Sequence, residues 1–346
     1  ITLVRTFSGT DSPSVTALDV VAGKLVTAGY RDLKFIDLDL GEVVWDGVGP
    51  HTPEAMTHLE DHLAFACGGA GLNTYAVKSS GYPPSTDVFG MGETPKHLQI
   101  DGEFLFGHYG SKVYCFDLTQ ETPSLAWSYP PGDSSEYVLS LQAKDGRVYI
   151  GQLSGGVQIL EYDRYGFTEL VHFHPGGQEI VDLAMMDSVL AVLFDPIDDM
   201  WIQRELHLYD LTDITSPVLL DTYANDDFPN LLAAGTTIAL WDSSVNAHGI
   251  MVLDASNPAN LVEASHVATP PLARVTRNGE VLNIVASPSL QMVDVSNPYA
   301  PHFGSAISIP DAYYFAAQGN SGYLVNTDLV FDLSDPLSPV LVLSLI

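Results

Sequence analysis

Histidine and glutamate are the residues of this chain whose types and spacing could perform chemistry. Eleven histidines stand against only 13 lysines and arginines together. His172 and His174 are two residues apart in "HFHPGG", so both side chains would lie on one side of a strand. Such a pair beside a carboxylate suits a divalent metal such as zinc, although no HExxH motif or cysteine cluster fixes a geometry. The histidines that could serve as metal ligands are His51, His172, His174 and His248.

Without a metal, the same histidines and nearby glutamates could act as general acids and bases. The candidates for catalysis are His97, Glu136, His174, Glu179 and Arg274. The candidates for ligand binding are Glu54, Lys96, Asn230, Trp201 and Tyr313. Scattered surface histidines with no common role are the competing interpretation.

A longer acidic segment, "FDPIDDMWIQREL" at residues 194–206, offers a second kind of site. Asp195, Asp198 and Asp199 could hold Ca²⁺, which prefers oxygen ligands. Trp201 beside these acids could also stack on a sugar ring. The full EF-hand pattern is absent, so a solvated acidic loop is the alternative.

Nucleophile and phosphate-binding motifs are absent from the sequence. There is no GxSxG, and the glycine pairs in "GGAG", "SGG" and "PGG" lack the strand-to-helix context of a phosphate loop. We expect these glycines to form turns of a β protein.

The elements that position the candidate residues are repeats. A short apolar run of the form "LxIVD" recurs from one end of the chain to the other. The runs end at Asp37, Ala76, Asp117, Glu161, Asp210, Asp254, Asp294 and Asp332, which are 39, 41, 44, 49, 44, 40 and 38 residues apart. A period of about 40 residues is typical of an array or a propeller. Ala76 and Glu161 mark the two degenerate copies.

Each unit predicts four short strands. In the seventh unit, "LARVTRNG", "EVLNIVAS", "LQMVD" and "HFGSAIS" alternate apolar and polar residues with a period of two. Four-stranded antiparallel units repeated around a ring predict a single all-β domain over residues 1–346, a β-propeller with eight blades. Seven blades, with one unit displaced, is the alternative. The segment "ITLVRTF" at residues 1–7 would be an N-terminal clasp strand that closes the ring on the last blade.

This arrangement assigns the faces of the ring. Because the strands run alternately up and down, the innermost strands would begin at one mouth of the central channel. Glu54, Lys96, His97, Glu136, Glu179, Asn230 and Arg274 all stand near the start of a predicted innermost strand. Charged residues that face one axis are costly unless they are paired, hydrated or bound to a metal, so this mouth is the predicted site.

The sequence motif that ends the third predicted strand of a unit resembles that of a known family. "MVLDASNPANL", "MVDVSNPYAP" and "LVFDLSDPLSP" resemble the LVIVD-repeat family of secreted or surface proteins. The resemblance implies a β-propeller and a location outside the cytoplasm, and it brings no catalytic motif. We interpret the repeated aspartate as structural, because its carboxylate can accept backbone N–H groups of the following turn.

Composition limits the partners. The formal net charge of -30, from 43 acidic and 13 basic residues, would repel nucleic acid and anionic membranes. No apolar run reaches the roughly 18 residues that a membrane helix needs, so we expect no membrane insertion. Cys67 and Cys115 lie in strand-like runs and are expected to be buried free thiols, with a disulfide between them as the alternative. We expect a monomer located outside the cytoplasm.

The sequence therefore leaves three hypotheses for function. The first is a secreted or surface propeller that recognises a glycan, peptide or small molecule at the channel mouth. The second is a hydrolase or lyase that uses His and Glu at the mouth, with or without a divalent metal. The third is a purely structural surface protein.

Overall fold

The computed structural model describes the following residues: 15–21, 24–29, 32–37, 42–48, 53–59, 62–67, 71–76, 86–89, 96–119, 124–129, 137–153, 156–174, 179–195, 204–225, 228–242, 249–270, 273–309, 314–318, 320–325 and 329–344. Every regular element within these ranges is a β-strand. Across them there is no helix long and apolar enough to span a bilayer.

The strands in the first half of the chain form four antiparallel sheets, numbered here in chain order. Sheet 1 contains β1 (Val15–Val21), β2 (Lys24–Gly29), β3 (Asp32–Asp37) and β4 (Glu42–Val48). Sheet 2 contains β5 (Pro53–Leu59), β6 (His62–Cys67), β7 (Gly71–Ala76) and β8 (Thr86–Phe89). Sheet 3 contains β9 (Lys96–Asp101), β10 (Phe104–Tyr109), β11 (Lys112–Asp117) and β12 (Ser124–Tyr129). Sheet 4 contains β13 (Val138–Lys144), β14 (Arg147–Gln152), β15 (Gly156–Asp163) and β16 (Gly166–Phe173).

The second half of the chain repeats this order. Sheet 5 contains β17 (Glu179–Met186), β18 (Val189–Asp195), β19 (Arg204–Asp210) and β20 (Val218–Asn225). Sheet 6 contains β21 (Asn230–Ala234), β22 (Thr237–Trp241), β23 (Ile250–Asp254) and β24 (Val262–Val267). Sheet 7 contains β25 (Arg274–Asn278), β26 (Val281–Ala286), β27 (Ser289–Asp294), β28 (His302–Phe303) and β29 (Ile307–Ser308). Sheet 8 contains β30 (Tyr314–Gln318), β31 (Ser321–Val325), β32 (Leu329–Asp332) and β33 (Val340–Ser344).

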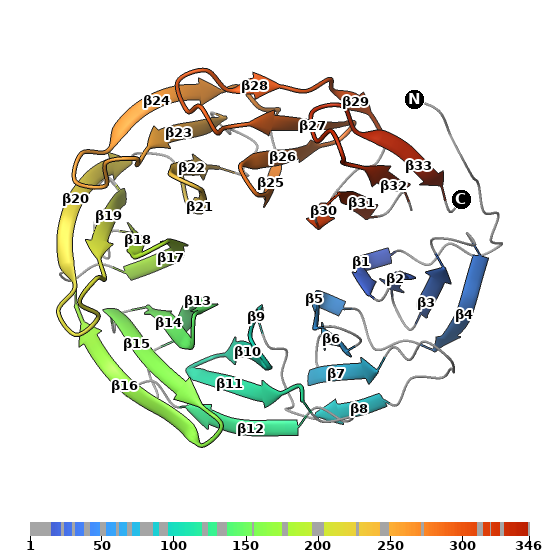
Figure 1. Ribbon diagram of the computed structural model, residues 1–346, viewed down its shortest axis with the longest axis horizontal. Helices are drawn as coiled ribbons and strands as arrows, with labels where there is room; N and C mark the ends of the chain where they lie inside the picture. Colours follow the sequence, from blue (N-terminus) through green and yellow to red (C-terminus); the bar gives the residue numbers. More distant parts are fainter. Residues whose placement is uncertain are drawn as a thin grey trace.

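The described strands thus make eight sheets, which stand side by side in a ring (Figure 1). The first strand of each sheet faces the centre of the ring and the fourth lies at its outer edge (Figure 1). Strand β1 of the first sheet contacts β30 and β31 of the last, so the two ends of the array meet. The predicted clasp strand at residues 1–7 lies outside the described residues.

Each described seam between neighbouring sheets is filled by apolar side chains from both. In β19, Leu206 and Leu208 are fully buried in the cluster between sheets 5 and 6. Tyr209 points the other way and packs with Val157 and Ile159 of sheet 4. The period-two alternation of the sequence therefore buries both faces of a sheet in the ring, which a single blade could not do.

The seam between sheets 3 and 4 differs because it is aromatic. Phe104 and Phe106 of β10 lie against Tyr162 of β15 at ring-centroid distances of 5.4 and 4.7 Å. Trp127 of β12 packs edge-on against Phe167 of β16 at 4.6 Å. Cys115 is a free and fully buried thiol within the same cluster, as predicted, and burial raises the pKa of this thiol.

The repeated aspartate is structural, as predicted. At the ends of β11 and β19, Asp117 and Asp210 each accept hydrogen bonds from the backbone N–H and the hydroxyl of the threonine two residues later. The carboxylates of Asp254, Asp294 and Asp332 accept the N–H of the serine at the same spacing, at 2.8–2.9 Å. The motif therefore holds the turn that leads to the outer strand of its sheet.

These turns make the stability of the fold depend on pH. Hydrogen bonds from Thr212 lower the pKa of Asp210, and those from Ser256 lower the pKa of Asp254. The carboxylates therefore contribute stability that is fully present above the pKa of the unfolded chain and is lost as the pH falls through their folded pKa. We expect Asp210→Asn and Asp254→Asn to lower the urea midpoint at pH 7, and this difference from the wild type to shrink below about pH 4.

The measurement is urea unfolding of wild type and both variants between pH 7 and pH 3. Glu161→Gln is the control, because Glu161 is exposed on β15. The urea midpoint of this variant should stay close to that of the wild type at every pH. A pH-independent difference for the two aspartate variants would contradict this account of the turns.

Two elements differ from the sequence prediction. In sheet 7 the predicted fourth strand is divided into β28 and β29, and the Gly304 N–H between them donates to Met292 O at 2.9 Å. In sheet 4 the third strand does not end at Glu161 but continues to Asp163 and turns directly into β16. The degenerate copy thus lacks the aspartate turn because its strands are longer.

Candidate functional site

Three predicted mouth residues occupy equivalent places in the structure. Glu179, Asn230 and Arg274 are the first residues of β17, β21 and β25, which are the innermost strands of sheets 5, 6 and 7. Arg274 is exposed, whereas Glu179 and Asn230 are half-buried. The side-chain amide of Asn230 donates to Trp241 O at 2.9 Å. These side chains therefore lie at one rim, on neighbouring sheets, as the alternation of strand directions predicts.

The remaining mouth residues are only partly covered by the structure. Glu54 lies in β5, and Lys96 and His97 begin β9, but their side chains are outside the described part. His51, Glu136, Trp201, His248 and Tyr313 lie outside the described residues. The hydrolase or lyase hypothesis needs at least two histidines and one glutamate to converge, and it stays untested because the side chains of His97 and Glu136 are outside the described part.

The predicted histidine pair lies at the end of β16, with His172 in the strand and His174 just after it. The rings of His172 and His174 lie 4.6 Å apart between centroids, with an angle of 41° between their planes. His174 is exposed and His172 is half-buried. Within the described ranges, no three His, Cys, Asp or Glu side chains group closely enough to hold a metal ion. The metal site therefore stays a prediction, and of its four candidate ligands only His172 and His174 are described.

The acidic segment begins with an ion pair. Asp195 at the end of β18 lies 3.3 Å from the guanidinium of Arg204 at the start of β19. Its carboxylate is thus already neutralised by a neighbour on the next strand. Asp198 and Asp199 lie outside the described residues, so the calcium hypothesis is untested.

A carboxylate network on the innermost strands was missed by the sequence analysis. Asp182 of β17 accepts a hydrogen bond from the Ser140 hydroxyl of β13 at 3.0 Å. Its other oxygen accepts the Leu231 N–H of β21 at 3.4 Å. One side chain therefore links the innermost strands of three consecutive sheets. A bulge in β17 between Ile180 and Asp182 places the Asp182 carboxylate between these strands. No local sequence pattern predicts such a bulge.

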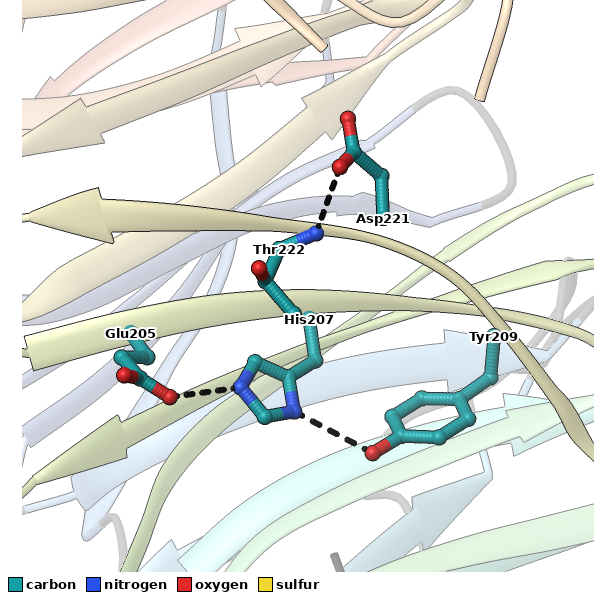
Figure 2. A network of polar contacts seen from close by, with 5 residues as sticks. All are labelled: Glu205, His207, Tyr209, Asp221 and Thr222. Atoms are coloured by element: carbon teal, nitrogen blue, oxygen red, sulfur yellow. Dashed lines mark hydrogen bonds and ion pairs between the residues drawn. The ribbon is translucent and has the colours of Figure 1, made fainter. Parts of the chain in front are cut away.

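A second missed network runs along β19 (Figure 2). The ring of His207 contacts the Glu205 carboxylate through Nε2 at 2.8 Å and the Tyr209 hydroxyl through Nδ1 at 3.2 Å. Burial, followed by the charge of Glu205, raises the pKa of Tyr209 to about 12. The tyrosine hydroxyl therefore keeps its proton at neutral pH, and which ring nitrogen of His207 donates depends on the tautomer of the imidazole. The nearby Asp221 carboxylate accepts the Thr222 N–H at 2.8 Å on β20 (Figure 2).

The histidine and tyrosine of this second network are enclosed, whereas the Glu205 side chain is 40% exposed. The side chain of His207 is 8% exposed, and its ring lies 4.7 Å from that of Phe194. Tyr209 is covered in turn by Phe173 of sheet 4 at 5.0 Å. The alternation in "ELHLYD" places Glu205, His207 and Tyr209 on one side of the strand, which is the signal that could have revealed them.

Comparison with known proteins identifies the fold. No family model and no curated protein matches the sequence. Saccharomyces cerevisiae Sqt1 superposes with a TM-score of 0.70 at 8% identity, covering 99% of both chains. Chaetomium thermophilum Sqt1 gives 0.65 at 14% identity, covering 96% of this chain and 98% of its own. The computationally designed Ika8 protein gives 0.65 at 12% identity, covering 93% and 96%. At these identities the likeness concerns the fold alone, and the chain is a β-propeller.

Proposed function

We propose that this chain is a closed, eight-bladed propeller that binds a peptide segment of a partner protein at the channel mouth. The eight described sheets and the contact of β1 with β30 and β31 support the blade count and the closure. Binding without turnover at this mouth is the activity that the site supports best.

The observation that carries the proposal is a break in the repeat. The turn aspartates recur from sheet to sheet, whereas the first residues of three successive innermost strands are Glu179, Asn230 and Arg274. A residue that recurs at one position on most of the blades serves the scaffold. Different polar groups at one equivalent position suit a ligand that crosses several blades, as an extended peptide does, and that needs a different partner at each step.

The charge indicates which peptide fits. With a net charge of -30, the long-range field of the protein attracts a basic segment and repels an acidic one. Nucleic acid and anionic membranes are disfavoured for the same reason. The proposal also includes a monomer that acts outside the cytoplasm, as the resemblance of its repeats implies.

A similar propeller offers a precedent. Chaetomium thermophilum Sqt1 was solved bound to the N-terminus of the ribosomal protein L10, and that structure superposes with a TM-score of 0.63 at 12% identity, covering 92% of this chain and 96% of its own. A ring of this kind can therefore hold a terminal segment of another protein. The precedent concerns the mode of binding and not the identity of the partner.

The test is a selection from a displayed library of random 12-residue peptides, followed by affinity measurements on the enriched peptides. We expect enriched peptides to be basic and Glu179→Lys to weaken their binding about tenfold, or roughly 1.4 kcal/mol. Glu161→Lys is the matched control, because it makes the same charge reversal on an exposed residue near the opposite face. Failure to enrich any peptide, or equal weakening by both variants, would refute the proposal.

A further inference from the structure

A recess lies on the face opposite the mouth, at the seam between sheets 3 and 4. Its volume is about 490 Å³, and it is lined by Glu103, Phe104, Asp117, Thr119 and Arg164. Glu103 lies in the turn after β9 and Phe104 begins β10. Asp117 ends β11, Thr119 follows it, and Arg164 comes from the turn between β15 and β16. The volume is within the roughly 300–1,000 Å³ typical of small-molecule sites.

The recess exists because sheet 4 departs from the repeat. Strands β15 and β16 are eight residues each and are joined by a tight turn instead of the aspartate motif. The Asp163 carboxylate accepts the N–H groups of Tyr165 and Gly166 at 2.6 and 3.1 Å, which holds this turn. The turn also reaches sheet 3, where the Trp127 indole donates to Arg164 O at 3.5 Å. Arg164 is thereby carried beside the turns of the neighbouring sheet.

The apolar wall of the recess is fixed in place. The half-buried ring of Phe104 packs against Trp127 at 5.5 Å and edge-on against Tyr162 at 5.4 Å. The Tyr162 hydroxyl donates to the Asp101 carboxylate at 2.8 Å, and this carboxylate also accepts the Gly146 N–H at 2.7 Å. The aromatic surface is therefore rigid before any ligand arrives.

The polar lining combines acceptors with a donor. Glu103 and Arg164 are exposed. One oxygen of Asp117 accepts both bonds from Thr119, at 2.8 and 2.6 Å, and leaves the other available. Among the residues that the structure describes, no ion pair joins Arg164 to either carboxylate. A guanidinium and two carboxylates thus flank one aromatic wall with their hydrogen-bonding capacity largely unused.

We propose that this recess binds one pyranose unit of a glycan. A sugar hydroxyl can both donate to Glu103 or Asp117 and accept from Arg164, while the C–H face of the ring packs on Phe104. A purely anionic ligand would meet two carboxylates, and a cationic one would meet the guanidinium. An apolar ligand would bury three charged groups without partners, which is costly. A neutral polyhydroxylated ring satisfies all of the lining groups.

The test uses four disaccharides as probes: cellobiose, maltose, lactose and N,N′-diacetylchitobiose. Saturation-transfer NMR would detect contact and calorimetry would give the affinity. We expect at least one probe to bind, with contact to one ring, and Glu103→Gln and Arg164→Gln to weaken it at least tenfold. The matched controls are Glu280→Gln, at the equivalent turn "NGE" of sheet 7, and Arg277→Gln, both at exposed positions. The controls should change affinity less than twofold.

Two results would overturn the proposal. One is that none of the four disaccharides binds. This result contradicts the proposal even if a cationic probe, N-acetylarginine amide, binds. The other is that the control variants weaken binding as much as the recess variants. The outcome is independent of the mouth, because peptides selected there should bind Arg164→Gln as tightly as the wild type.

Discussion

Replacing Phe106 by alanine is expected to lower the free energy of unfolding by about 3–5 kcal/mol. Phe106 is fully buried in the seam between sheets 3 and 4, where its ring lies 4.7 Å from Tyr162 and 6.3 Å from Phe167. The truncation removes the apolar surface of the ring and leaves a cavity. The surrounding strands belong to two sheets whose spacing is set by the whole ring, so they cannot close that cavity.

Urea unfolding followed by both tryptophan fluorescence and circular dichroism measures this effect, because coincident transitions permit a two-state free energy. Phe303→Ala is the matched control, since Phe303 is 46% exposed on β28 and its loss should cost less than about 1 kcal/mol. Equal losses of unfolding free energy for the two variants would show that Phe106 in the aromatic seam contributes no more to stability than a surface residue.

The repeat could be read from the sequence because its determinants are local. Strands β3, β11, β19, β23, β27 and β32 end at the predicted Asp37, Asp117, Asp210, Asp254, Asp294 and Asp332. β7 ends at Ala76, so the strand pattern survives the loss of the aspartate. Alternation and turn hydrogen bonds span a few residues each, and therefore leave a signal within a single unit. The all-β propeller followed from these local signals.

The Asp182 network and the recess could not be read in this way because they join residues about one repeat apart. Ser140 and Asp182 are 42 residues apart, and a bulge decides which way the aspartate faces. The recess depends on a turn of sheet 4 that reaches Trp127 of sheet 3, 37 residues earlier. The distance between two neighbouring sheets at a given point along their seam is set by closure of the whole ring. A short stretch of sequence therefore does not encode it. Glu179, Asn230 and Arg274 begin β17, β21 and β25 because position along a strand is itself a local property that the sequence pattern carries.

Gly304→Ala is expected to lower the free energy of unfolding by about 2–3 kcal/mol, because the position has no room for a side chain. A Cβ atom at Gly304 would overlap the carbonyl oxygen of Leu337 and lie 3.0 Å from its Cα. The obstacle is backbone, so no rotamer change relieves it. Leu337 is itself held in a turn of sheet 8, where its N–H donates to the Asp335 carboxylate at 3.2 Å.

The control for this substitution is Gly279→Ala, in the turn between β25 and β26. Gly279 has a φ of +61°, and no atom lies within 4 Å of the place that a Cβ would take, so alanine there suffers only the backbone penalty of roughly 1–2 kcal/mol. Gly304 is not among the glycines with positive φ, so its cost is steric. If Gly304→Ala unfolds at the same urea concentration as wild type, sheets 7 and 8 do not approach as closely as described.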